Sequence, residues 1–252
     1  MPKSTLKKIK IILYPICIVL IFVSVWNLWS IRKSTERTTQ MYAALAETAH
    51  ADEEEENIGE DTAGNPRLLA LKEQNPELAG WITIPNTAID YPVMQTVEDN
   101  DYYLKHDFQG NEDIHGTPFL DTNCKLGVSQ NLIIYGHHMK DGTMFQNLML
   151  YKDSAFCEDN PIIYFDTIDR SGIYELLFVM VMSEKDTEEF PYYKCINLTS
   201  EETYQGFFKR CSQYACWSSG EMPDYGEELL TLSTCEYSNK NGRLVIVARR
   251  VN

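Results

Sequence analysis

A cysteine, a histidine and an arginine stand at positions from which they could together attack a carbonyl group. Cys235 ends the run LLTLSTC, His137 follows the apolar run NLIIYG, and Arg243 comes eight positions after the cysteine. A thiol with an ordinary pKa of about 8.5 is mostly protonated at neutral pH, so a nucleophilic cysteine needs a proton partner such as imidazole. An arginine has several donors that can hold a developing oxyanion. These residue types therefore suit acyl-transfer chemistry.

Each of the three residues also has a purely structural interpretation. A cysteine at a strand end is usually a small core residue, a histidine after a strand is usually at the surface, and an arginine that opens a strand usually pairs with an acid. The adjacent His138 follows the same strand as His137 and is the alternative proton partner. The catalytic interpretation therefore depends on the combination of the three residues in this order.

Short strands, separated by clusters of Pro, Gly and Asn, must position these residues. Eight runs have strand character: WITI, AIDYPVMQ, GTPFL, NLIIYG, PIIYFDT, IYELLFVMVM, LLTLSTC and RLVIVARR. Such a series predicts a mainly β protein with a closed or nearly closed barrel. Helical character appears in PRLLALKEQ, which Asn75-Pro76 would stop, in GTMFQNLMLY, and in SEETYQGFFKRCSQYACW. The last of these predicts a full helix inserted between two late strands.

The polar segment EYSNKNG after Cys235 is long enough to turn and to bring the next strand back antiparallel. Arg243 would then open that returning strand beside Cys235. His137 follows a strand and a glycine, which predicts that its imidazole lies at a barrel rim, as Cys235 does. The pattern therefore predicts that the three side chains meet at one end of the barrel.

The first 65 residues differ in composition from the rest. An uncharged run from Ile11 to Trp29 is long enough, at about 1.5 Å per residue, to span a hydrocarbon layer of about 30 Å. We therefore expect a basic tail at 1–10, a transmembrane signal anchor at 11–30, a stalk and acidic linker at 31–65 and a catalytic domain at 66–252. Four lysines precede the run, so the positive-inside tendency predicts a cytoplasmic amino terminus and an extracytoplasmic domain.

Charge and cysteine usage exclude several functions. The 252 residues carry a net charge of −15, and residues 1–37 hold seven basic residues and one acidic residue, so the rest of the chain is strongly acidic. Such a chain is a poor nucleic-acid binder. None of the seven cysteines forms a CxxC pair, so we expect no zinc site, and the sequence predicts no cofactor.

The sequence resembles the sortases, and in particular those of class B. The resemblance rests on TLSTC at 231–235, on YGHHM at 135–139 and on the spacing from the cysteine to Arg243. It extends to NPELAGWITIPNTAIDYPVMQ at 75–95 and to EDNDYYLKHDF at 98–108. A single N-terminal anchor and a helix inserted before the cysteine strand are also similar to class B. The resemblance covers the chain from about residue 66 to its end.

This resemblance implies a sortase-type eight-stranded β-barrel with peripheral helices. It implies a cysteine transpeptidase that cleaves a C-terminal sorting signal after its threonine, forms a thioacyl-enzyme and transfers the protein to a cell-wall amine. The implied partners are surface proteins with a sorting signal, a peptidoglycan precursor or other amine acceptor, and the cytoplasmic membrane. The implied catalytic residues are Cys235 as nucleophile, His137 as general acid and base, and Arg243 as oxyanion and substrate clamp. The implied substrate-binding residues are Ser233, Asn100 and Leu104.

Other thiol enzymes and a non-enzymatic protein give different expectations. An L,D-transpeptidase would have a run of the Ser-x-Gly-Cys-Arg type, and a papain-like peptidase has its cysteine before its histidine. Neither pattern is present in this sequence. A tethered barrel that only binds a partner predicts no special reactivity of Cys235.

Overall fold

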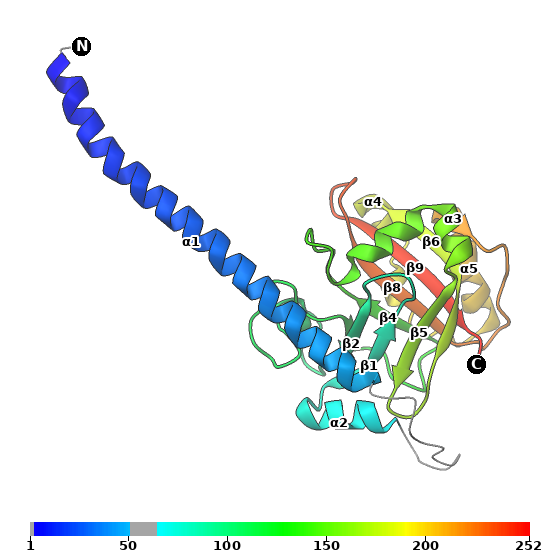
Figure 1. Ribbon diagram of the computed structural model, residues 1–252. Coiled ribbons are helices and arrows are strands. Elements are labelled where there is room, and N and C mark those ends of the chain that lie inside the picture. Colours follow the sequence, from blue (N-terminus) through cyan, green and yellow to red (C-terminus); the bar gives the residue numbers. More distant parts are fainter. Residues whose placement is uncertain (1–2, 51–64) are drawn as a thin grey trace. The chain divides into compact units, whose positions relative to one another are not determined.

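The computed structural model describes residues 3–50 and 65–252, and the chain divides into two units (Figure 1). The first unit is Met1–Ala43 and the second is Ala44–Asn252. One long helix, α1 (Lys3–His50), makes up the described part of the first unit. Its last residues, 44–50, are assigned to the second unit. The helix includes residues 31–50 of the predicted stalk and linker. Residues 51–64, which hold most of the predicted acidic linker, lie outside the described residues.

The predicted membrane anchor at 11–30 falls within α1. In the part of the chain that the structure describes, no helix has both the length and the apolar character needed to cross a membrane. Several side chains of this segment lie outside the described residues. The transmembrane anchor therefore stays a prediction from the sequence.

Eight strands of the second unit close into a barrel, as the sequence predicted. The strands follow the order β5-β1-β2-β3-β4-β8-β9-β6, and a further pairing between β5 and β6 closes the ring. Closure leaves no open edge among these strands. The eight strands are β1 (Leu78–Thr83), β2 (Asp90–Met94), β3 (Phe119–Leu120), β4 (Asn131–Tyr135), β5 (Ile162–Thr167), β6 (Ile173–Met182), β8 (Leu229–Glu236) and β9 (Gly242–Arg250).

Local capping residues set the bounds of the peripheral helices. In α2 (Pro66–Gln74) the side chain of Asn65 accepts hydrogen bonds from the first turn, and Pro66 occupies the first helical position, as the sequence predicted. Ser200 and Thr203 form a capping box at the start of α5 (Glu201–Tyr214). The remaining short helices are η1 (Tyr102–Leu104), η2 (Phe145–Lys152), α3 (Ser154–Asp159), α4 (Glu184–Glu189) and η3 (Tyr192–Lys194).

The inserted helix α5 is shorter than the sequence predicted. We expected it to continue to Trp217, but residues Ala215–Ser218 form a ninth strand, β7, which pairs with β6. The long strand β6 pairs with β5 at its start and with β7 further along. The backbone groups of β6 beyond the end of β5 thus find their partners in β7, and this tertiary pairing outweighs the helical pattern of the sequence.

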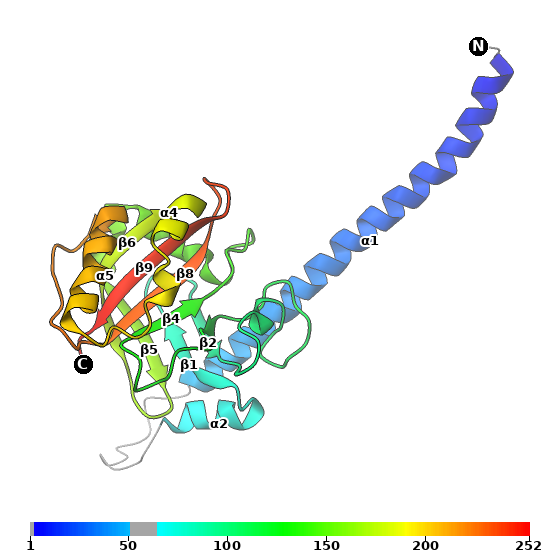
Figure 2. The same cartoon turned by 180° about the vertical axis from the view of Figure 1, so that it is seen from behind.

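Helix α5 packs on the outside of the barrel through one apolar face (Figure 2). Its buried residues are Tyr204, Phe207, Phe208 and Cys211, four positions that lie on one helical stripe. They join a cluster with Phe178 and Met180 of β6 and with Val245 and Val247 of β9. This packing fixes the insertion between β6 and β8 firmly against the barrel wall.

Three adjacent strands bring the residues of interest to one rim of the barrel. β4 runs parallel to β8, with Tyr135 opposite Ser233, and β8 runs antiparallel to β9, with Cys235 opposite Arg243. Gly136 extends the parallel pairing, because its N–H donates to the Ser233 carbonyl at 3.2 Å. His137 therefore leaves β4 at the level where β8 reaches Cys235.

The lack of a side chain at Gly136 allows the chain to pass close to the barrel core. A Cβ atom at this position would lie 2.6 Å from Cγ of Phe145, whose side chain is fully buried. Such a contact is far below van der Waals distance, and a buried aromatic ring cannot move away freely. The path of the chain into His137 therefore depends on glycine.

We predict that Gly136→Ala lowers the free energy of unfolding by about 1–3 kcal/mol, because overpacking a close-packed core has a penalty of this size. Gly206→Ala is the matched control, since a Cβ there meets nothing within 4 Å and the position is an exposed one in α5. This control should raise the stability by about 0.5–1 kcal/mol. Urea denaturation of the full chain measures both changes. Equal stability of Gly136→Ala and the wild type would contradict the packing argument.

Candidate active site

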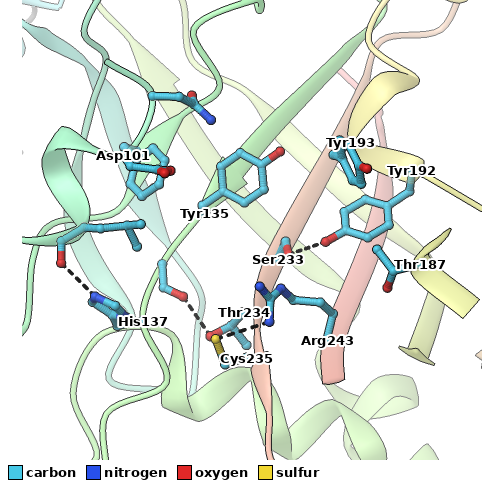
Figure 3. A pocket seen from close by; sticks show the side chains of 14 residues that line it. Asp101, Tyr135, His137, Thr187, Tyr192, Tyr193, Ser233, Thr234, Cys235 and Arg243 are labelled. Atoms are coloured by element: carbon cyan, nitrogen blue, oxygen red, sulfur yellow. Dashed lines mark hydrogen bonds between the residues drawn. The ribbon is translucent and has the colours of Figure 1, made fainter. Parts of the chain in front are cut away.

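A cavity of about 370 Å³ opens at the barrel rim where β4 and β8 end and β9 begins (Figure 3). Its walls come from these strands, from the segment around η1, and from α4 and η3. All six residues that the sequence indicated line this one cavity: Cys235, His137, Arg243, Ser233, Asn100 and Leu104. The structure therefore brings together residues that are up to 143 positions apart in the sequence.

Cys235 and Arg243 face each other across the β8–β9 pairing. The two residues are register partners, and Nη1 of Arg243 lies 3.5 Å from Sγ of Cys235. The same nitrogen donates to the Gly242 carbonyl at 3.1 Å, which fixes the guanidinium in this orientation. In Figure 3 the sulfur is seen between the imidazole of His137 and the guanidinium. A cation with planar donors thus stands next to a half-buried thiol.

A backbone carbonyl sets the tautomer of His137. Nε2 of the imidazole lies 2.7 Å from the carbonyl oxygen of Leu104. A carbonyl can only accept, so Nε2 carries a hydrogen, and Nδ1 holds the lone pair when the ring is neutral. Nδ1 is therefore the nitrogen that can take up a proton. The backbone of His137 is held as well, because its carbonyl accepts from the N–H of Phe145 at 2.8 Å.

The two adjacent histidines lie in different surroundings. His137 lines the cavity, whereas His138 is absent from its walls. Nδ1 of His138 lies 2.9 Å from the carbonyl oxygen of Cys235 instead. The geometry therefore favours His137 over His138 as the proton partner of the thiol.

The residues indicated as substrate-binding already have partners inside the protein. The hydroxyl of the buried Ser233 is 2.8 Å from the hydroxyl of Tyr192, and Oδ1 of Asn100 accepts from the N–H of Thr122 at 2.9 Å. Leu104 contributes its carbonyl to His137 and lines the cavity. These contacts hold the cavity wall in shape.

Sequence reasoning missed the tyrosines that form much of the cavity wall. They are Tyr135, Tyr192 and Tyr193, and Thr187 lies beside them. The hydroxyl of Tyr135 donates to Asp121 at 3.0 Å, and burial together with this carboxylate raises the pKa of Tyr135 well above its ordinary value. Burial also raises the pKa of Tyr192. Both side chains are therefore neutral hydrogen-bonding groups. Tyr135 could have been found from its place in YGHHM, but the segment of Tyr192 carried no strand or helix pattern.

Comparison with known proteins agrees with this geometry. The family model described as a sortase domain matches residues 82–251, which is more than half of the chain. The chain belongs to the sortase family. The sortase B of Listeria monocytogenes is 32% identical over 187 residues, covering 73% of this chain and 74% of that protein. The sortase B of Staphylococcus aureus is 33% identical over 187 residues, with the same coverage.

A solved structure gives the same result for the fold. The Staphylococcus aureus sortase B–substrate complex superposes with a TM-score of 0.75 at 26% sequence identity, covering 87% of this chain and 99% of that one. Together with the sequence relatives, this match shows that the present chain is a cysteine transpeptidase of the sortase B type. The expectation drawn from the cysteine, histidine and arginine motifs is thus confirmed at the level of the family.

The other thiols of this sortase lie away from the cavity. All seven cysteines are free, and Cys235 is the one that lines the cavity. Burial raises the pKa of Cys124 and of Cys157 to about 12. These two thiols stay protonated at neutral pH. Within residues 3–50 and 65–252, no group of three or more His, Cys, Asp or Glu side chains is placed to hold a metal ion.

The residue after the cysteine anchors the end of β8. The buried carboxylate of Glu236 accepts from Nζ of Lys152 at 2.8 Å and from the N–H of Ser238 at 2.9 Å. Burial alone would raise the pKa of Glu236, but these hydrogen bonds outweigh burial and lower the pKa below its ordinary value. The ionised carboxylate therefore stabilises the turn that leads from Cys235 to Arg243.

We predict that Glu236→Gln loses stability at neutral pH and that the loss disappears in acid. The folded pKa of Glu236 is lowered, so its contribution is complete above the ordinary carboxyl pKa of about 4.3 and is lost as the pH falls through the folded value. Unfolding by urea at pH 7 and below pH 4 measures this difference. The exposed Glu73→Gln is the control and should show no such dependence. A deficit of equal size at both pH values would contradict a role for the ionised carboxylate.

Proposed function

We propose that Cys235 is the nucleophile of this sortase, that His137 is its general acid and base, and that Arg243 holds the oxyanion and the substrate. The observation that carries this proposal is the 3.5 Å contact between Arg243 Nη1 and Cys235 Sγ in a cavity that His137 also lines. The three groups supply a thiol, a proton carrier and a fixed cation within one small space.

The reaction would proceed in two transfers. The sulfur of Cys235 attacks the carbonyl carbon of the threonine in the sorting signal, and the thiol proton passes to Nδ1 of His137. The carbonyl oxygen becomes an oxyanion, which the guanidinium of Arg243 stabilises. The C–N bond then breaks, His137 returns the proton to the leaving amine, and a thioester joins Cys235 to the threonine. In the second transfer an amine attacks this thioester, and its proton passes through His137 to the departing sulfur.

The cavity walls support a role in holding the sorting signal before the scissile bond. Ser233, Asn100 and Leu104 would contact the substrate, together with the tyrosine walls. Aromatic and hydroxyl side chains suit an extended peptide, because they offer both apolar area and hydrogen-bonding groups. The acceptor would be a cell-wall amine, such as a peptidoglycan precursor, and the substrates would be surface proteins with a C-terminal sorting signal.

The N-terminal composition supports membrane tethering. We propose that residues 11–30 anchor the chain, with the amino terminus in the cytoplasm and the catalytic domain outside, because an uncharged run follows four lysines. Alkaline extraction of membranes tests this arrangement. The full chain should remain in the membrane pellet, and a chain without residues 1–30 should be released. Release of the full chain would contradict the anchor.

We predict that Cys235→Ala and His137→Ala each abolish cleavage of a sorting peptide, because among the described residues no other cysteine or histidine lines the cavity. Cys216→Ala removes an exposed thiol outside the cavity and is the matched control, which should keep its activity. Cleavage of a labelled peptide by the purified chain measures all three variants. Activity retained in Cys235→Ala would refute the assignment of the nucleophile.

We predict that Arg243→Lys lowers turnover about 10²- to 10³-fold, because lysine keeps the charge but loses the planar set of donors. Arg249→Lys is the control on the same strand, since Arg249 forms ion pairs with Glu175 and Glu221 away from the cavity. Turnover and thermal unfolding are measured on the same samples. If Arg243→Lys turned over within a few-fold of the wild type, Arg243 would be only a surface cation.

A further inference from the structure

His138 binds the strand that carries the nucleophile. Its Nδ1 lies 2.9 Å from the carbonyl oxygen of Cys235, and the imidazole is not part of the cavity wall. Because a carbonyl only accepts hydrogen bonds, Nδ1 must carry the hydrogen of this bond. The bond exists in the charged ring and in the neutral ring with its hydrogen on Nδ1. The hydrogen bond to the Cys235 carbonyl can therefore form whether or not His138 is charged.

The imidazole of His138 replaces a backbone donor that the β4–β8 pairing lacks beyond the end of β4. In this parallel pairing the N–H of Gly136 donates to the Ser233 carbonyl, so the next carbonyl on the same side of β8 is that of Cys235. The backbone N–H of residue 138 would be its partner if β4 continued. Strand β4 ends at Tyr135, however, and His138 instead forms an isolated antiparallel bridge with Met144. The side chain of His138 reaches back and supplies the donor.

Tyr237, which follows Cys235 by two residues, contacts both the backbone and the ring of His138. The hydroxyl of Tyr237 donates to the backbone carbonyl of His138 at 3.1 Å, and the two rings lie 4.7 Å apart with an interplanar angle of 35°. Earlier in the same two segments, the hydroxyl of Thr234 donates to the Gly136 carbonyl at 2.7 Å. The segment that carries His137 and the segment that carries Cys235 are thus joined by side chains in both directions.

We propose that His138 is a positioning residue that holds the peptide plane between Cys235 and Glu236. The N–H and C=O of a trans peptide point in opposite directions, so a bond to the Cys235 carbonyl also sets the direction of the Glu236 N–H and the backbone angle that aims the thiol. The inference rests on the proposed function, in which Cys235 is the nucleophile. A small rotation of this plane would move the sulfur away from Arg243, and misplacement at this scale slows acyl transfer strongly.

Replacement of His138 by two different amides tests this role in the full chain. The side-chain nitrogen of asparagine is as many bonds from Cα as Nδ1 of histidine, whereas that of glutamine is one bond further. We expect His138→Ala and His138→Gln to lower kcat about two- to tenfold, the rate equivalent of one hydrogen bond, with KM for a sorting peptide unchanged within about twofold. His138→Asn should restore most of kcat.

Tyr237→Phe gives a second measurement, because it removes only one hydroxyl, from a side chain that is exposed and outside the core. It should lower kcat about two- to fivefold with KM unchanged, since it loosens His138 without removing it. Thermal unfolding of each variant separates a change in kcat from a loss of stability. If His138→Ala does not fold, the comparison of asparagine with glutamine and the Tyr237→Phe result decide the question.

Several results would overturn the proposal. Equal kcat in the asparagine and glutamine variants, or a kcat of His138→Ala equal to that of the wild type, would show that the bond to Cys235 does not position the thiol. A raised KM with unchanged kcat would make His138 a substrate contact, and complete loss of activity, as in His137→Ala, would make it the proton carrier. Activity in Cys235→Ala would instead refute the proposed function itself, so the two failures are distinguishable.

Discussion

The site depends on the hydrogen-bond register of three neighbouring strands. Cys235 lies opposite Arg243 in the antiparallel pairing of β8 and β9, and Tyr135 lies opposite Ser233 in the parallel pairing of β4 and β8. Side chains alternate between the two faces of a strand, so a shift of one residue in either pairing would turn a member of the site to the opposite face. The chemistry is therefore set by backbone pairing before any side chain makes its own contact.

Burial on both sides protects this register. Every residue of β8 except Cys235 is buried, and five consecutive residues of β9, from Leu244 to Ala248, are fully buried. A slip of one residue would exchange the side chains of the two faces, so the close packing on both faces of β8 and β9 would be lost. The barrel is closed by the β5–β6 pairing, so the strands also cannot separate at an open edge. A rigid frame thus holds the thiol of Cys235 at the one position of β8 that is not buried.

Much of the site could be predicted from the sequence, because its members lie at strand ends. The alternating run before Cys235 and the short polar connection to Arg243 imply an antiparallel return, and the strand and glycine before His137 imply a position at the same rim. The tyrosine wall could not be predicted in this way. Tyr192 and Tyr193 reach the cavity because the insertion between β6 and β8 folds back over the rim, a tertiary arrangement that no local pattern records. The ninth strand β7 was missed for a related reason, since its partner is a strand more than thirty residues earlier.

The thioacyl-enzyme tests the central claim, that backbone register places Cys235 where it can accept an acyl group. The full chain is mixed with a sorting peptide without an acceptor amine, stopped in acid after short times and examined by mass spectrometry. The account predicts a mass increase equal to the peptide up to its threonine, located on the fragment that contains Cys235 and removed by adding an amine. An acyl group on another residue, or cleavage of the peptide with no adduct at any time, would contradict it.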